Sequence, residues 1–109
     1  MSGQLGGYVS ARWYAVTETL DELNGATSGS VCLPQHVDWG PRRPFDLADD
    51  ADVAVMYERV LRESQSVEDL RAYLNANTLC RLWSALVLPR QARALWEDRF
   101  RELRSAAVV

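Results

Sequence analysis

His36 and Asp38 are neighbouring side chains whose types could carry acid–base or metal chemistry. His36 is the only histidine among the 109 residues, and no cluster of cysteines or carboxylates lies near it in the sequence. A zinc site needs a set of such ligands, and general acid–base catalysis needs a second positioned group in a pocket. The sequence therefore predicts no catalytic residue, no metal and no cofactor. A histidine that bonds locally or contacts a partner is favoured over a small enzyme that uses His36.

Arg42 and Arg43 form the most interaction-like cluster of the chain. Two prolines enclose the pair, and Trp39 and Phe45 lie on either side of it. Arginine and aromatic residues carry much of the binding energy in protein interfaces, and a proline-restricted loop loses less entropy on docking. The same residues would also serve as an intramolecular lock, in which the aromatic rings fix the loop to the helices and the arginines pair with carboxylates. The two interpretations are equally favoured, and both can hold together.

An acidic run follows this cluster and consists of Asp46, Asp49, Asp50 and Asp52. Carboxylates at the start of a helix accept hydrogen bonds from its first N–H groups and interact favourably with its dipole. Capping by Asp46 or Asp49 therefore explains the run, and we favour it over a cation site or a phosphate mimic.

The composition is typical of a folded domain that does not wrap nucleic acid. Hydrophobic residues make up 48% of the chain and charged residues 25%, which excludes the class of disordered, highly charged chains. The net charge of −3 disfavours a protein whose main task is to neutralise phosphates. Cys32 and Cys80 are too few for a disulfide framework, and we expect two reduced, buried thiols. Neither a secretion signal nor a membrane-spanning run is recognisable, so the expected location is cytoplasmic.

Hydrophobic periodicity and capping signals predict an all-α fold, a compact small helical domain of about five helices with a Pro-rich extended arm between the first two. The clearest pattern recurs at i, i+3, i+4, i+7 and i+8 and comprises Val53, Met56, Tyr57, Val60 and Leu61. The expected order is a flexible leader over 1–9, a helix over 11–23, the arm over 26–47, helices over 51–63, 66–74, 78–86 and 89–104, and a frayed tail over 105–109. Residues 10–104 form the single domain, and Asn77 is the expected cap of the helix over 78–86.

The arm should be extended and turning between Leu33 and Leu47, because each of its three prolines disfavours helical conformation in the residue before it. Ser30 to Leu33 is a short β-favouring run. An extended linker that packs Val31 and Leu33 into the core is favoured over an edge strand supplied to the sheet of a partner.

The helices over 66–86 and the arginine-bearing helix after Pro89 also suggest a helix-turn-helix regulator that binds DNA. Arg90 and Arg93 would then contact bases or phosphates. Glu97, Asp98 and Glu102 lie on the same segment and would face phosphates unfavourably. A solvated face of mixed charge is therefore favoured, and DNA binding is kept as the alternative function, for instance in autoregulation.

Three segments taken together resemble a family of small actinobacterial-type proteins: PQHVDWGPRRPFDLADDADVAVMYERVLRE, DLRAYLNANTLCRLW and LVLPRQARALWEDRFREL. The shared features are a P-x-H-x-D-W arm, an M-Y-E-x-V-L-R-E helix and an L-P-x-x-V/A-R-x-x-W-E-x-R-F close. The resemblance covers Ser28 to Leu103. Members of this family look like the antitoxin half of pairs encoded beside AbiEii-like nucleotidyltransferase toxins.

The resemblance implies a protein that is not an enzyme and that neutralises a cognate nucleotidyltransferase toxin by direct contact, covering or distorting its active-site groove. Grooves that accept nucleotides and tRNA tend to be basic, so an acidic protein with a rigid aromatic arm is a plausible complement. The residues expected to contact this partner are His36, Asp38, Trp39, Arg42, Arg43 and Phe45. Tyr57, Trp83 and Trp96 are expected mainly in the core.

Overall fold

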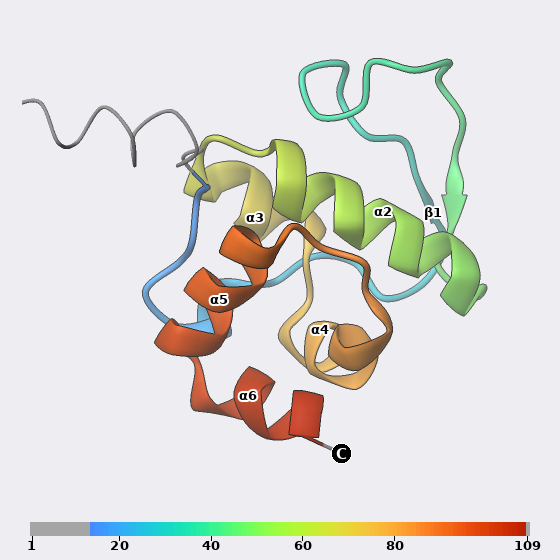
Figure 1. Ribbon diagram of the computed structural model, residues 1–109. Coiled ribbons are helices and arrows are strands. Elements are labelled where there is room, and N and C mark those ends of the chain that lie inside the picture. Colours follow the sequence, from blue (N-terminus) through green and yellow to red (C-terminus); the bar gives the residue numbers. More distant parts are fainter. Residues whose placement is uncertain (1–13, 109) are drawn as a thin grey trace, which may run out of the picture.

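Five α-helices and a two-stranded sheet make up the part of the chain that the computed structural model describes, residues 14–108 (Figure 1). The elements are η1 (Leu20–Glu22), β1 (Ser30–Val31), β2 (Phe45–Asp46), α2 (Asp50–Glu63), α3 (Val67–Tyr73), α4 (Ala76–Leu82), η2 (Trp83–Ala85), α5 (Arg90–Arg99) and α6 (Arg101–Val108). The predicted all-α fold is therefore confirmed in its largely helical character and wrong in leaving out the small sheet.

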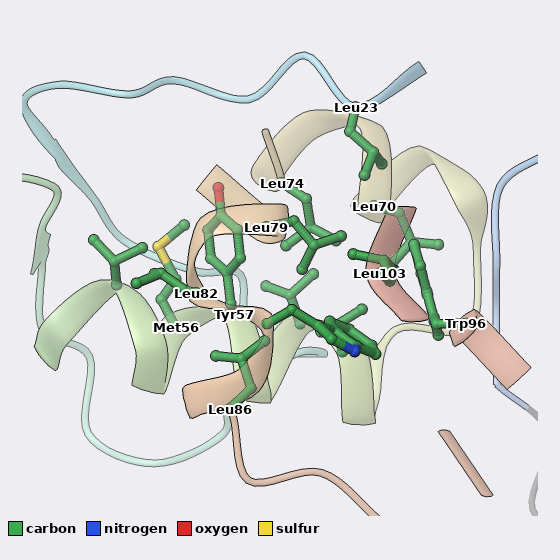
Figure 2. Packing of buried hydrophobic residues seen from close by; sticks show 14 of the residues in the cluster. Leu23, Met56, Tyr57, Leu70, Leu74, Leu79, Leu82, Leu86, Trp96 and Leu103 are labelled. Carbon is green, nitrogen blue, oxygen red and sulfur yellow. The ribbon is translucent and has the colours of Figure 1, made fainter. Parts of the chain in front are cut away.

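Helix α2 lies at the centre of the packing. Its five periodic side chains are all buried, as their spacing predicted: Val53, Met56, Tyr57, Val60 and Leu61. Figure 2 shows Met56 and Tyr57 reaching from α2 toward Leu74 and Leu79. Trp83 and Trp96 are also fully buried, which confirms their predicted place in the core. Because one face of α2 is buried in this core, the opposite face is left at the surface, where it contacts the arm.

The predicted helix over 11–23 is wrong for the residues that the structure describes. Its first three residues lie outside the described part, and from Tyr14 onward only the short turn η1 is helical. The carboxylate of Glu22 accepts hydrogen bonds from the N–H groups of Glu18 at 3.1 Å and Thr19 at 2.9 Å. The Thr17 hydroxyl donates to the carbonyl of Thr19 at 2.8 Å. These local bonds give the backbone an alternative to the helical ladder.

This N-terminal segment is instead an extended strap against the end of α3. The Asn24 N–H donates to the carbonyl of Arg71 at 3.2 Å, and the Gly25 N–H donates to the carbonyl of Leu74 at 2.7 Å. A Cβ on Gly25 would lie 2.7 Å from the carbonyl carbon of Tyr73. Glycine is therefore required here by the close approach of two backbones.

The predicted capping of α3 is confirmed, and that of α4 is shifted by two residues. Ser66 accepts from the N–H of Asp69 at the start of α3. At α4 the cap is Asn75, whose side chain accepts from the N–H of Thr78 at 3.2 Å, and not Asn77. Asn75 is held in that place because its own N–H donates to the Tyr57 hydroxyl at 2.8 Å. A tertiary contact therefore selects between two asparagines that are equally suitable caps in sequence.

The final helix, predicted over 89–104, is broken at Phe100 into α5 and α6. Phe100 has extended dihedral angles (φ −123°, ψ 110°), and its ring lies 5.5 Å from that of Trp96. The break turns α6 back onto α4 and η2 (Figure 1), where Leu103 is fully buried. Helix α6 then continues to Val108, through most of the stretch expected to be a frayed tail. The predicted leader over 1–9 lies outside the described residues.

The arm is a hairpin whose two strands belong to this chain. Ser30 pairs with Asp46 and Val31 with Phe45 in an antiparallel ladder, so β1 is paired internally on one edge. Leu33 is buried and Val31 partly so, as the linker interpretation expected. Residues 32–44, which we call the arm loop, run between the strands and project beyond α2 (Figure 1). In residues 14–108 no helix is both long enough and apolar enough to cross a membrane.

Candidate functional site

Two ion pairs and one histidine–carboxylate hydrogen bond hold the arm loop against α2 and α3. The Asp38 carboxylate accepts from Nη1 of Arg59 on α2 at 2.8 Å. Nε2 of His36 lies 2.8 Å from Oδ2 of Asp69 on α3. Nη1 of Arg43 lies 3.5 Å from Oδ1 of Asp52 at the start of α2. The loop is therefore attached to the helical body at three points.

Phe45 and Trp39 have opposite environments. Phe45 is 1% exposed and belongs to the core, with the guanidinium of Arg43 stacked 4.3 Å from its ring centre. Trp39 is 76% exposed, the largest apolar surface side chain of the described residues. Phe45, predicted as a partner contact, is therefore buried in the core at the base of the arm and is not exposed at the surface.

The remaining predicted contacts divide into those that hold the loop and those that face solvent. Asp38 and Arg43 are each engaged in an ion pair, and His36 is hydrogen-bonded to Asp69. Arg42 is exposed and makes no hydrogen bond or ion pair with any described residue. The intramolecular-lock interpretation therefore holds for Arg43 and Phe45, whereas Trp39 and Arg42 remain available for an interface.

A groove opens beside Trp39, between the arm loop and the junction of α2 with α3. Its volume is about 700 Å³, and we call it the Trp39 groove. Seven residues line it: Gln35, His36, Trp39, Glu63, Gln65, Ser66 and Asp69. A second, smaller hollow of about 310 Å³ lies on another side of the loop and shares Trp39 and Glu63. The indole of Trp39 therefore lines two adjoining hollows.

The aspartates of the acidic run cap α2 and bond it to neighbouring elements, and the capping confirms the favoured interpretation. The Asp49 side chain accepts from the N–H of Ala51 at 3.0 Å and is the N-cap of α2. Oδ2 of Asp52 accepts from the N–H of Asp46 at 2.9 Å, which joins β2 to the helix. Asp50 pairs with Arg81 of α4 at 2.8 Å, and this hydrogen bond raises the pKa of the Arg81 guanidinium. These aspartates are therefore occupied by structural bonds.

Arg93 takes part in a network of polar contacts inside the helical body. Nothing in the sequence indicated this network. Its guanidinium donates to the carbonyls of Leu86 and Trp83 and stacks 5.0 Å from the Trp83 ring centre. Glu97 pairs with Arg93 at 3.5 Å and accepts from the Trp83 indole N–H at 2.8 Å. Arg93 is thus committed within the chain, which removes one of the two arginines on which the DNA-binding alternative was based.

The described residues offer little to support chemistry of their own. No group of three or more His, Cys, Asp or Glu side chains converges as a metal site within residues 14–108. Cys32, which directly follows β1, is exposed, against expectation. Cys80 is half-buried, and burial, with a contribution from Glu102, raises the pKa of its thiol. A raised pKa makes the reactive thiolate of Cys80 less abundant.

The residues that the sequence did not single out are the helix partners of the arm. Arg59 and Asp69 lie 21 and 33 residues away from the loop residues that they hold. Both read in sequence as ordinary charges on the polar faces of helices. Only the path of the arm over α2 and α3 brings them to the site.

Comparison of the chain with protein-family models, with curated protein sequences and with solved structures gave no match. The fold and the site define a mostly helical domain that displays a tethered aromatic loop. Function is therefore argued from this loop.

Proposed function

We propose that this protein is a binding protein that neutralises a cognate nucleotidyltransferase toxin by direct contact, as an antitoxin. The observation that supports the proposal best is the exposure of Trp39 on a loop held by two ion pairs and the His36–Asp69 hydrogen bond. An exposed tryptophan on a disordered loop would lose much entropy on binding, and the three contacts to the helices reduce that loss. Such a side chain is typical of the few residues that dominate the affinity of an interface.

Arg42 supplies the second element of the proposed interface. It lies three residues after Trp39, is exposed, and is not committed to a carboxylate of the described chain. Tryptophan and arginine are the residue types most enriched among energetic hot spots. The partner-binding residues of the proposal are therefore Trp39 and Arg42, with His36, Asp38 and Arg43 holding the loop in place.

The charge of the chain fits the same kind of partner. The net charge is −3, and a protein that binds nucleotides and tRNA presents a basic groove. Opposite charges on two partners increase the rate of association and fix their relative orientation. The proposed mode of action is occlusion or distortion of that groove by the arm.

The test is a nucleotide-transfer assay with the purified product of the neighbouring gene and tRNA as the acceptor. The proposal predicts that the two proteins co-purify and that transfer falls to background at equal molar amounts. Undiminished transfer in the presence of a saturating excess of this protein would refute the proposal. A gel-shift titration of promoter DNA at low salt, run in parallel, tests the DNA-binding alternative, which requires a salt-sensitive shift.

A further inference from the structure

The Trp39 groove combines an aromatic wall with an acidic one. On one side stands the indole of Trp39, which is 76% exposed. On the other side are the carboxylates of Glu63, at the end of α2, and Asp69, in the first turn of α3. The Glu63 carboxylate is already paired with Nε of Arg62 at 3.1 Å, so Asp69 is the carboxylate that the groove offers to a ligand.

The acceptors of the groove are placed for a ligand with several N–H donors. His36 and Ser66 both bond to Oδ2 of Asp69, at 2.8 and 3.4 Å, while Oδ1 makes no hydrogen bond with a described residue. Gln35 and Gln65 add amide carbonyls along the rim. The contacts within the chain therefore hold Asp69 in position and leave one of its oxygens to accept from outside.

We propose that the Trp39 groove receives an arginine side chain of the partner protein. A guanidinium is planar, stacks on an indole face and donates five N–H groups, so it can contact the Trp39 ring and the Asp69 carboxylate together. A lysine ammonium would satisfy the charge but would not stack in the same way. The inference rests on the proposed function for its macromolecular partner and names the group of that partner that is recognised.

The probe is N-acetyl-arginine amide, titrated into the ¹⁵N-labelled full chain while the indole N–H resonance of Trp39 is followed by NMR. A free amino-acid derivative tests the groove without the partner, so this experiment can fail or succeed independently of the toxin assay. The expected result is a saturable shift of the Trp39 indole and of the Gly40 and Ser66 amides. The citrulline derivative, which keeps the shape of arginine without its charge, should produce less than about a fifth of the effect at equal concentration.

Substitutions at Trp39 and Asp69 test whether each side of the groove contributes to binding. D69N and W39A should each weaken the arginine derivative by about fivefold or more, read from the Gly40 and Ser66 amides. E68Q is the matched control, because Glu68 is the neighbour of Asp69 on α3, is 78% exposed and lies outside the groove. It should bind as the wild type does. If D69N lowers the thermal stability, W39A carries the test, because Trp39 is 76% exposed and its loss should leave the fold intact.

Three outcomes would overturn the inference. The first is no saturable shift with the arginine derivative, and the second is an equal loss of binding in E68Q and D69N, which would indicate unspecific attraction. The third is a stronger shift with adenosine monophosphate than with arginine, which would make the groove a site for a stacked base. A groove that binds arginine in a protein that fails to inhibit nucleotide transfer would leave this inference standing and refute the proposed toxin partner.

Discussion

Two aromatic side chains of the arm, six residues apart, differ completely in burial. Phe45 is part of the core and Trp39 lies in solvent. Replacement of Phe45 by alanine should lower the free energy of unfolding by about 3–5 kcal/mol, because it removes a ring and leaves a cavity. Replacement of Trp39 by alanine should change it by less than about 0.5 kcal/mol. Urea denaturation of the two variants measures the difference, and a loss in W39A as large as that in F45A would show that Trp39 packs onto the body.

Tyr57 gives the core a dependence on alkaline pH. Burial raises the pKa of its hydroxyl, which accepts from the N–H of Asn75. Above the value of an unfolded tyrosine, about pH 10, the unfolded chain releases this proton while the folded chain retains it. The contribution is therefore complete below about pH 10 and is lost as the pH rises through the higher folded pKa.

The variant Y57F isolates this effect. It should be less stable than the wild type at pH 8, by about 1–2 kcal/mol, because the Asn75 N–H loses its acceptor. That difference should shrink as the pH rises above about 10, since the variant carries no titrating hydroxyl. Urea midpoints at a series of pH values test the prediction, which fails if the two proteins differ by a constant amount throughout.

At the scale of elements, the sequence predicted a helix correctly where the spacing of apolar residues alone determines the local structure. The five periodic residues of α2 are buried as expected, and the helix spans Asp50–Glu63 against a predicted 51–63. The segment before Leu23 has a similar period but is not helical where the structure describes it, because Glu22 and Thr17 bond to the local backbone. Its backbone then pairs with α3 and α4 across the molecule, including a bridge from Asn24 to Asn75. The local spacing of apolar residues does not predict such long-range bonds.

The strap from Tyr14 to Gly25 should be the element most sensitive to added volume. The variant G25A would place a Cβ within 2.9 Å of the backbone of Leu74, so we expect a loss of about 1–3 kcal/mol in the free energy of unfolding. G40A is the matched control, because its Cβ would meet only Oδ1 of Asp38 at 3.5 Å. Chemical denaturation of both variants tests the docking of the strap. Equal stability of G25A and the wild type would contradict it.

At the scale of the whole molecule, the candidate site depends on the path of the arm more than on any motif. The sequence predicted a stiff proline-rich arm with Trp39 and Arg42 among its contacts, and the structure leaves these two exposed. It did not predict that Arg59 and Asp69 hold the loop, because a surface charge on a helix has many candidate partners. Nor did it separate Phe45 from Trp39, since both are aromatic residues next to the same arginine pair. The path of the arm over α2 and α3 decides which of its residues bond to the helices and which remain exposed.

The central claim is that the tethered loop binds the partner through Trp39 and Arg42. The most direct measurement is the affinity of the double variant W39A/R42A for the cognate nucleotidyltransferase, by isothermal titration calorimetry. We expect a loss of about 2–4 kcal/mol in binding free energy, with the thermal stability of the free variant unchanged. The matched control is V87A/R104A, because Val87 is also 76% exposed and Arg104 is exposed on α6, away from the arm loop in Figure 1. Unchanged affinity of W39A/R42A, or an equal loss in the control, would contradict the claim.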